Sequence, residues 1–209
     1  MELLTVATFA LVAVVAIATP GPTVLLALAN GSRFGVRRAT FGMLGAVASD
    51  VVLVSAVALG LGAIFAASEL VFSIVKWIGV AYLVFLGVML LRSKGTMGHA
   101  GEQEGGRGSR RSVFLKSFLV AVTNPKGYLF VGALLPQFID PAQPQLVQYL
   151  AIGLVFCGID FIIMFAYAVL GTQAVRLLRR SGALWIDRVC GTVLLGLAAS
   201  LAFVRRANA

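Results

Sequence analysis

Two prolines interrupt a long apolar run in the stretch IATPGPTVLL, residues 17–26. Because proline lacks a backbone N–H and its ring clashes with the preceding helical turn, Pro20 and Pro22 predict a break in the helix that the flanking residues favour. The composition places that break in a membrane. Of the 209 residues, 60% are hydrophobic and 12% are charged, and the mean hydropathy is +0.99, whereas a soluble domain carries about 25% charged residues.

Six apolar runs are each long enough to cross a bilayer, which takes about 20 residues. They are residues 3–29, 39–67, 70–91, 113–135, 146–170 and 183–204. The sequence has no long alternation typical of β-strands, and helices satisfy their own backbone in lipid. The expected fold class is all-α, a polytopic membrane protein with six transmembrane helices. A cleaved signal peptide ending at AIA, residues 16–18, is less favoured because no basic segment precedes the apolar run.

Basic residues gather between alternate predicted spans. Thirteen of the 17 lysine and arginine residues lie in or beside residues 33–38, 92–116 and 176–188. Because cytoplasmic loops carry the excess of basic residues, these connections are predicted to be cytoplasmic and both termini to lie outside. Arg205 and Arg206 do not fit this rule. The net charge of +9 is better explained by topology than by nucleic-acid binding, since no aromatic residues interleave with the basic ones.

The two halves of the chain resemble each other. A glycine-rich, charged stretch, residues 92–112, predicts a flexible cytoplasmic linker between a first three-helix repeat, residues 1–91, and a second, residues 113–209. FALVAVVAIATP, residues 9–20, aligns without a gap with FLKSFLVAVTNP, residues 114–125. An odd number of spans per repeat inverts the second copy, so we expect two inverted repeats with helices one and four broken.

The two breaks supply the candidate substrate-binding residues. In transporters built from inverted repeats, broken helices face the substrate near the membrane midplane. The N-terminus of the following half-helix also directs partial positive charge toward anionic groups. The predicted residues are Pro20, Gly21, Pro22, Thr23, Asn124, Pro125 and Lys126. The alternative is that the prolines only kink two helices.

One isolated acid lies in the second span of each half, Asp50 and Asp160. A charge at this depth costs about 2.5 to 3.5 kcal/mol on insertion scales, so both are candidates for coupling to protons or for binding a substrate amine. The alternative is structural, as a partner for Lys76 or Lys126 or in an interhelical hydrogen bond. Lys76 either forms an ion pair with Asp50 or extends its ammonium to the membrane surface.

Neither catalytic residues nor a metal site or cofactor are expected. Cys157 and Cys190 lie in apolar segments without C-x-x-C spacing, and the single histidine, His99, lies in the predicted linker. We interpret the cysteines as packing residues.

Several motifs resemble the LysE/RhtB family of bacterial amino-acid exporters. They are TPGPTVLLALANGSRFGVRRATFGMLGA, residues 19–46, LVFSIVKWIGVAYLVFLGVMLLRS, residues 70–93, and FLKSFLVAVTNPKGYLFVGALLPQFIDP, residues 114–141. The resemblance implies a six-helix inner-membrane protein that exports amino acids or related small metabolites, driven by the proton gradient. The family's PGP falls on Pro20, Gly21 and Pro22, its acid on Asp50, and its NPK on Asn124, Pro125 and Lys126. Thr23 departs from the pattern, since many relatives have Asn there.

Other functions remain open at this point. A cation exporter normally needs several converging oxygen ligands, and only two buried carboxylates are evident. An intramembrane enzyme lacks support from a GxSxG motif, a histidine-rich cluster or paired catalytic carboxylates. A purely structural role as a membrane scaffold would not explain why two helices are broken. The expected partners are an amino-acid substrate, protons and the lipid bilayer, and a homo-oligomer stays open.

Overall fold

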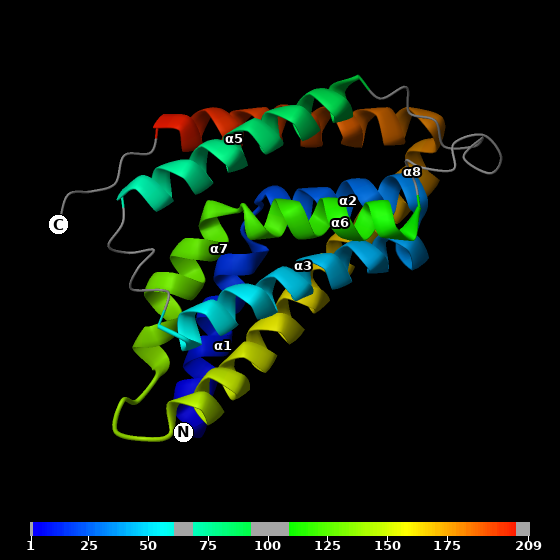
Figure 1. The fold of residues 1–209 in the computed structure, drawn as a ribbon. Helices are drawn as coiled ribbons and strands as arrows, with labels where there is room; N and C mark the ends of the chain where they lie inside the picture. Colours follow the sequence, from blue (N-terminus) through cyan, green and yellow to red (C-terminus); the bar gives the residue numbers. More distant parts are fainter. Residues whose placement is uncertain (1, 61–68, 93–108, 204–209) are drawn as a thin grey trace.

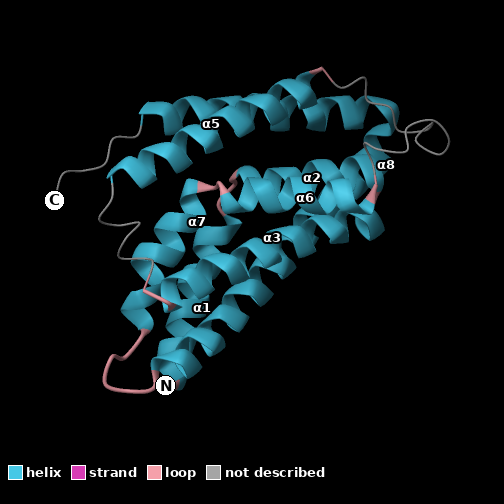
Figure 2. Cartoon of the chain, viewed as in Figure 1, coloured by secondary structure: helices cyan, strands magenta, loops and turns pink. Residues whose placement is uncertain are grey.

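Every regular element of the computed structural model is helical within the residues that it describes, 2–60, 69–92 and 109–203 (Figures 1 and 2). The α-helices are α1 (Leu3–Ala18), α2 (Pro22–Phe34), α3 (Val36–Ala58), α5 (Glu69–Leu91), α6 (Arg110–Val122), α7 (Pro125–Leu129) and α8 (Gln145–Phe203). A π-helical turn, η1 (Phe130–Leu134), and a 3₁₀ turn, η2 (Leu135–Phe138), follow α7. The predicted all-α class is confirmed.

The chain is a multi-pass membrane protein. Two helices are long and apolar enough to span a bilayer, Val36–Ala58 and the first part of α8, Gln145–Val175, and two bent pairs raise the number to as many as four in the described part of the chain. Trp77–Leu91 of α5 is a shorter apolar helix. The structure therefore supports several membrane crossings, and the number six stays a prediction.

Both predicted breaks occur. The axes of α1 and α2 differ by 62°, and those of α6 and the following segment, Lys126–Phe138, differ by 59°. Pro22 and Pro125 each begin the helix after the break, where the missing N–H costs the new helix nothing because its first N–H groups have no acceptor within it. The prolines thus end one helix and start the next.

The two broken helices lie side by side in opposite directions. Phe9 of α1 packs against Phe138 of η2, which follows the second break, with their ring centroids 5.2 Å apart. Leu25 of α2 and Val120 of α6, the helix before the second break, belong to one buried apolar cluster. The two breaks therefore lie at the same level of the bundle, and Figure 1 shows them together at its centre.

One helical element was predicted wrongly. Residues 171–182 were expected to connect two spans, but α8 continues as a single helix of 59 residues. Figure 1 shows its ribbon changing direction near the α8 label, after which it runs alongside α5. The segment AVRLLRR, residues 174–180, contains no proline or glycine and is rich in good helix formers, so the backbone turns without leaving the helix.

The start of α6 also differs from the sequence-based boundary. α6 begins at Arg110 rather than at residue 113, because the Ser109 hydroxyl accepts a hydrogen bond from the Ser112 N–H at 3.1 Å and caps the helix. The rest of the predicted linker, residues 93–108, lies outside the described residues, as does the end of the predicted second span, residues 61–67.

Glycines bring the helices that surround the breaks into backbone contact. A Cβ on Gly31 of α2 would lie 2.1 Å from the Ala168 carbonyl oxygen of α8, and one on Gly171 of α8 would lie 2.2 Å from that of Leu28. The Thr172 hydroxyl donates to the Gly31 carbonyl at 2.9 Å across the same crossing. Small residues of this kind allow close helix approach in lipid, and here they fix α2 against the helix that carries Asp160.

Candidate functional site

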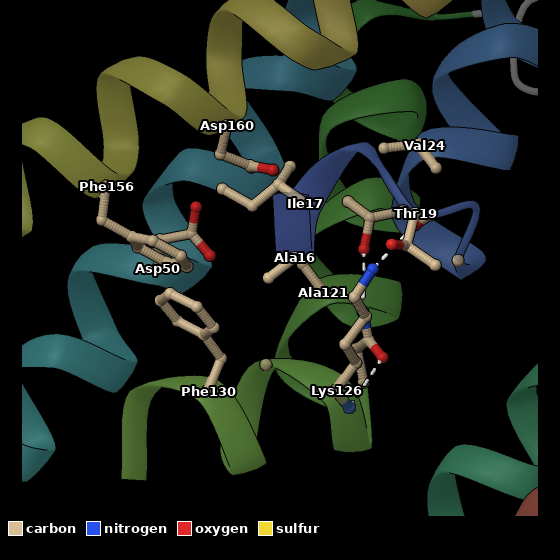
Figure 3. Close-up of a pocket in the computed structure, with 14 residues that line it drawn as sticks. Ala16, Ile17, Thr19, Val24, Asp50, Ala121, Lys126, Phe130, Phe156 and Asp160 are labelled. Carbon is tan, nitrogen blue, oxygen red and sulfur yellow. Dashed lines mark hydrogen bonds between the residues drawn. The ribbon is translucent and has the colours of Figure 1, made fainter. Parts of the chain in front are cut away.

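One pocket brings both helix breaks and both isolated acids together (Figure 3). It lies between the end of α1, the start of α2, the middle of α3, the second break and the first part of α8. Six of the ten residues predicted from the sequence line it: Gly21, Thr23, Asp50, Asn124, Lys126 and Asp160. Residues more than 100 positions apart in the chain thus face one small space.

The remaining predicted residues lie near the pocket or outside the described part. Pro20 is exposed at the first break, and Pro22 is buried at the start of α2. Pro125 begins α7. The side chains of Pro125 and Lys76 are not among those described, so the pairing of Lys76 with Asp50 stays a prediction.

Side chains from other helices satisfy two of the carbonyls that the first break leaves without helical donors. In a continuous helix, the Ala18 carbonyl would accept from the N–H of residue 22, but Pro22 has none. The Tyr167 hydroxyl of α8 donates to this oxygen at 2.9 Å. The next carbonyl, that of Thr19, accepts from the Lys126 ammonium at 2.7 Å. Tyr167 was not among the residues singled out from the sequence.

The second break is held in a similar way. The Val122 carbonyl accepts a hydrogen bond from the Tyr128 hydroxyl. The Asn124 side chain caps α7, since its Oδ1 accepts from the Lys126 N–H at 3.1 Å. Its Nδ2 donates to Thr23 Oγ1, also at 3.1 Å. The Asn124–Thr23 bond joins the second break directly to the first.

The two carboxyl groups are buried beside aromatic rings. Asp50 is 8% exposed and Asp160 is 7% exposed, and they lie close enough to interact electrostatically. Asp50 Oδ2 has no hydrogen-bond partner in the described part of the chain. The rings of Phe130 and Phe156 stack at 5.1 Å between centroids and line the same end of the pocket. An unpartnered carboxyl oxygen here is costly unless it binds a proton or a ligand.

A positive group lies at the other end of the pocket. Figure 3 shows Lys126 beside Thr19, apart from the two acids, with Ile17 between them in this view. The ammonium still acts electrostatically on Asp160. The pocket is therefore dipolar, and its volume of about 50 Å³ leaves room for only a few water molecules.

The profile of the LysE type translocator family matches residues 14–205. The chain belongs to this family. The resemblance seen in the PGP and NPK motifs is thereby confirmed, and the family match covers both breaks and both acids of this LysE type translocator.

Named relatives of this family member include efflux proteins. A homoserine/homoserine lactone efflux protein of Salmonella typhimurium is 36% identical over 74% of each chain. A leucine efflux protein of Klebsiella pneumoniae is 27% identical over 93% of each chain, and an uncharacterized membrane protein of Vibrio cholerae is 33% identical over 90% of this chain and 91% of its own. No solved structure matches the chain.

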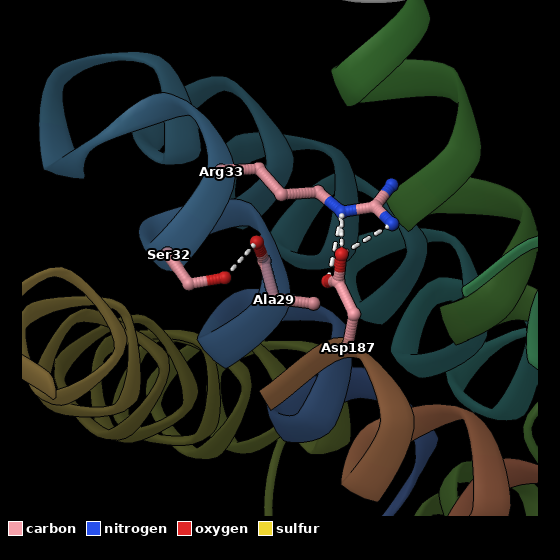
Figure 4. Close-up of polar contacts among 4 residues, drawn as sticks. All are labelled: Ala29, Ser32, Arg33 and Asp187. Atoms are coloured by element: carbon pink, nitrogen blue, oxygen red, sulfur yellow. Dashed lines mark hydrogen bonds and ion pairs between the residues drawn. The ribbon is translucent and has the colours of Figure 1, made fainter. Parts of the chain in front are cut away.

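A buried ion pair in this LysE type translocator was missed by the sequence analysis. Arg33, counted only as a topology signal, ends α2 and binds Asp187 in the second part of α8 (Figure 4). Arg33 Nε donates to both Asp187 carboxylate oxygens at 2.8 and 3.1 Å, and Nη2 donates at 2.8 Å. The sequence does contain a signal for this pair, because Asp187 is an acid within the apolar run 183–204. Asp50 and Asp160 were identified by the same kind of signal.

Proposed function

We propose that this protein exports amino acids or closely related small metabolites across the bacterial inner membrane in exchange for protons. The observation that carries the proposal is the dipolar pocket, in which Lys126 lies opposite Asp50 and Asp160 between two helix breaks. The names of the Salmonella typhimurium and Klebsiella pneumoniae relatives, homoserine/homoserine lactone efflux protein and leucine efflux protein, support amino-acid-like cargo.

The charges match a zwitterion. The α-carboxylate of the substrate binds at the Lys126 end, where Thr23 and Val24 of the first turn of α2 also line the pocket. Their backbone N–H groups have no acceptor within the helix and favour an anion. The α-ammonium binds at the Asp160 end, while the Asp50 carboxyl group, whose Oδ2 has no hydrogen-bond partner among the described residues, exchanges the proton. Both breaks line the end that binds the carboxylate, and the pocket of about 50 Å³ must widen to admit a substrate, so in this proposal transport depends on movement at the breaks.

We further propose six membrane crossings arranged as two inverted repeats, with the two parts of α8 as the fifth and sixth. The support is the similarity of the two bends, 62° and 59°, and the antiparallel pairing of α1 with η2 and of α2 with α6. Two copies related by inversion place their breaks at one level. The proposed topology puts the three basic connections in the cytoplasm and both termini outside.

A cation exporter fits this pocket less well. The Lys126 ammonium holds the Thr19 carbonyl and acts on Asp160. Those oxygens are the groups that would otherwise coordinate a metal ion, and a fixed positive charge beside them repels a cation. A zwitterion has a negative group to place against the lysine, which a metal ion lacks.

An efflux assay tests the proposal. Cells with and without the protein are loaded with a panel of amino acids that includes homoserine, leucine and lysine, and release is followed at several external pH values. We expect faster release of at least one member, and in vesicles an imposed pH difference should drive its accumulation against a gradient. No release across the panel, together with increased tolerance of metal ions, would support the cation exporter instead.

A labelling experiment tests the topology. A cysteine replacing Gly101 in a variant without Cys157 and Cys190 is expected to resist an impermeant maleimide in intact cells and to react after lysis. Reaction in intact cells would invert the proposed orientation.

A further inference from the structure

Among the described side chains, that of Tyr167 donates a hydrogen bond to the Ala18 carbonyl. In an unbroken helix this carbonyl would accept from the N–H of residue 22, which Pro22 lacks. The pairing is specific in register, because a helix joins the carbonyl of residue 18 to the N–H of residue 22 and residue 22 is a proline. The distance of 2.9 Å from the hydroxyl oxygen to the Ala18 oxygen is that of an ordinary O–H···O bond. The Tyr167 hydroxyl therefore donates the hydrogen bond that the missing N–H of residue 22 would have donated.

The same tyrosine belongs to the helix that carries an acid of the pocket. Tyr167 follows Asp160 by seven residues, about two helical turns, so the two side chains share one face of α8. One turn further, the Thr172 hydroxyl donates to the Gly31 carbonyl of α2. α8 therefore holds the first broken helix on both sides of the break, at Ala18 before it and at Gly31 after it.

We propose that Tyr167 is a positioning residue of the transport site, whose hydroxyl replaces the N–H missing at Pro22 and fixes the angle of the first break relative to Asp160. The bond sets where Thr19 and Thr23 stand with respect to the acids, and it links a shift of α8 to a shift of the break. Its role in transport rests on the proposed function, whereas its role at the break does not.

A double-mutant cycle tests the replacement of the N–H. Tyr167→Phe removes only the hydroxyl, and Pro22→Ala restores an N–H at residue 22. Thermal midpoints of the purified full-length protein in detergent are expected to fall by roughly 2 to 6 °C for Tyr167→Phe alone, and by less than half of that in the Pro22→Ala background. An equal loss in both backgrounds would show that the hydroxyl does not stand in for the missing donor.

A matched control lies on the same helix. The hydroxyl of Tyr149 has no hydrogen-bond partner among the described residues, so Tyr149→Phe is expected to show no coupling to Pro22→Ala. If Pro22→Ala does not fold, replacement of Tyr167 by p-aminophenylalanine still decides the question, since its amine keeps a donor at the ring's para position. It is expected to restore the midpoint lost in Tyr167→Phe, and failure to do so overturns the proposal.

Exchange of labelled homoserine across proteoliposome membranes separates positioning from stability. Tyr167→Phe is expected to raise the half-saturation concentration roughly ten-fold, Tyr149→Phe to leave it unchanged, and p-aminophenylalanine to restore it. Unchanged half-saturation in Tyr167→Phe would remove the role in transport. If the unmodified protein exchanges none of the panel of amino acids, the proposed function fails, while the thermal cycle still decides the role at the break.

Discussion

Arg33 and Asp187 join the far end of α2 to the second part of α8 through three hydrogen bonds of 2.8 to 3.1 Å. Asp187 is 1% exposed and the Arg33 side chain is 22% exposed. A planar guanidinium that binds both carboxylate oxygens fixes direction as well as distance. The first broken helix is thus held at its far end by a residue that comes 154 positions later in the chain.

Removing one member of this pair is expected to be more harmful than removing both. Arg33→Gln leaves the buried Asp187 carboxylate without its main counter-charge and should destabilise the protein by roughly 3 to 5 kcal/mol. Thermal unfolding in detergent measures the loss. Arg33→Met combined with Asp187→Leu should recover much of it, because no buried charge remains.

Arg37→Gln is the control for that experiment, since Arg37 is exposed and its loss should change stability by less than about 0.5 kcal/mol. A loss for Arg33→Gln as small as that for Arg37→Gln would contradict a stabilising ion pair.

Asp50→Asn is expected to separate substrate exchange from proton coupling. The amide keeps the shape and hydrogen-bonding capacity of the carboxyl group but cannot ionise. Vesicles containing the variant should still exchange labelled substrate at equal concentrations, yet should not accumulate it when a pH difference is imposed. Asp160→Asn is the comparison, and normal pH-driven accumulation by Asp50→Asn would assign the proton to Asp160 or remove it from the mechanism.

Thr23→Val is expected to loosen the connection between the two breaks. Valine has the same shape but cannot accept the hydrogen bond from Asn124, and the net loss should be about 1 kcal/mol. We expect a higher half-saturation concentration for exported amino acids with nearly normal amounts of protein in the membrane. Thr23→Asn, the residue common in the family, should retain a polar contact with Asn124, and equal defects in both variants would argue against this bond.

Gly171→Ala is expected to force α2 and α8 apart. The added Cβ would lie 2.2 Å from the Leu28 carbonyl oxygen, a backbone atom that cannot rotate away, and overpacking of this kind costs roughly 1 to 3 kcal/mol. Gly158→Ala on the same helix meets nothing within 4 Å and should leave the thermal midpoint unchanged or raise it slightly. Similar midpoints for the two variants would show that the crossing has room to adjust.

The sequence was most informative where chemistry is local. The absence of an N–H at Pro22 and Pro125 is a property of single residues, so the amino-acid order alone was enough to locate both breaks. An aspartate in an apolar span is costly wherever it lies, so Asp50 and Asp160 were also recognisable. That the two acids meet at one pocket follows from the packing of α3 and α8 and was not predicted from the sequence.

Contacts between distant segments were harder to predict. Many polar side chains could have satisfied the Ala18 carbonyl, and only the packing of α2 on α8 through Gly31 and Gly171 selects Tyr167. A positive charge is expected both of a residue at the membrane surface and of one in a buried ion pair. Arg33 was therefore assigned to topology, and its pairing with Asp187 was not predicted. α8 is continuous because the backbone of residues 174–180 stays helical where the chain changes direction. A hydropathy pattern does not specify whether such a segment is a helix or a loop.

The Arg33–Asp187 ion pair is sensitive to the angle between α1 and α2, because α2 connects the first break to Arg33. Thr23 lines the pocket and Arg33 lies ten residues later, so the two are separated by about 15 Å along one stiff helix. If α2 tilts by about 5° at the break, its end at Arg33 moves by roughly 1.3 Å. Such a displacement carries bonds of 2.8 Å beyond the range in which they hold. Unless the arginine side chain changes rotamer, the Arg33–Asp187 contact is therefore kept only within a narrow range of tilt, because α2 converts a small rotation near Thr23 into a larger displacement at Arg33.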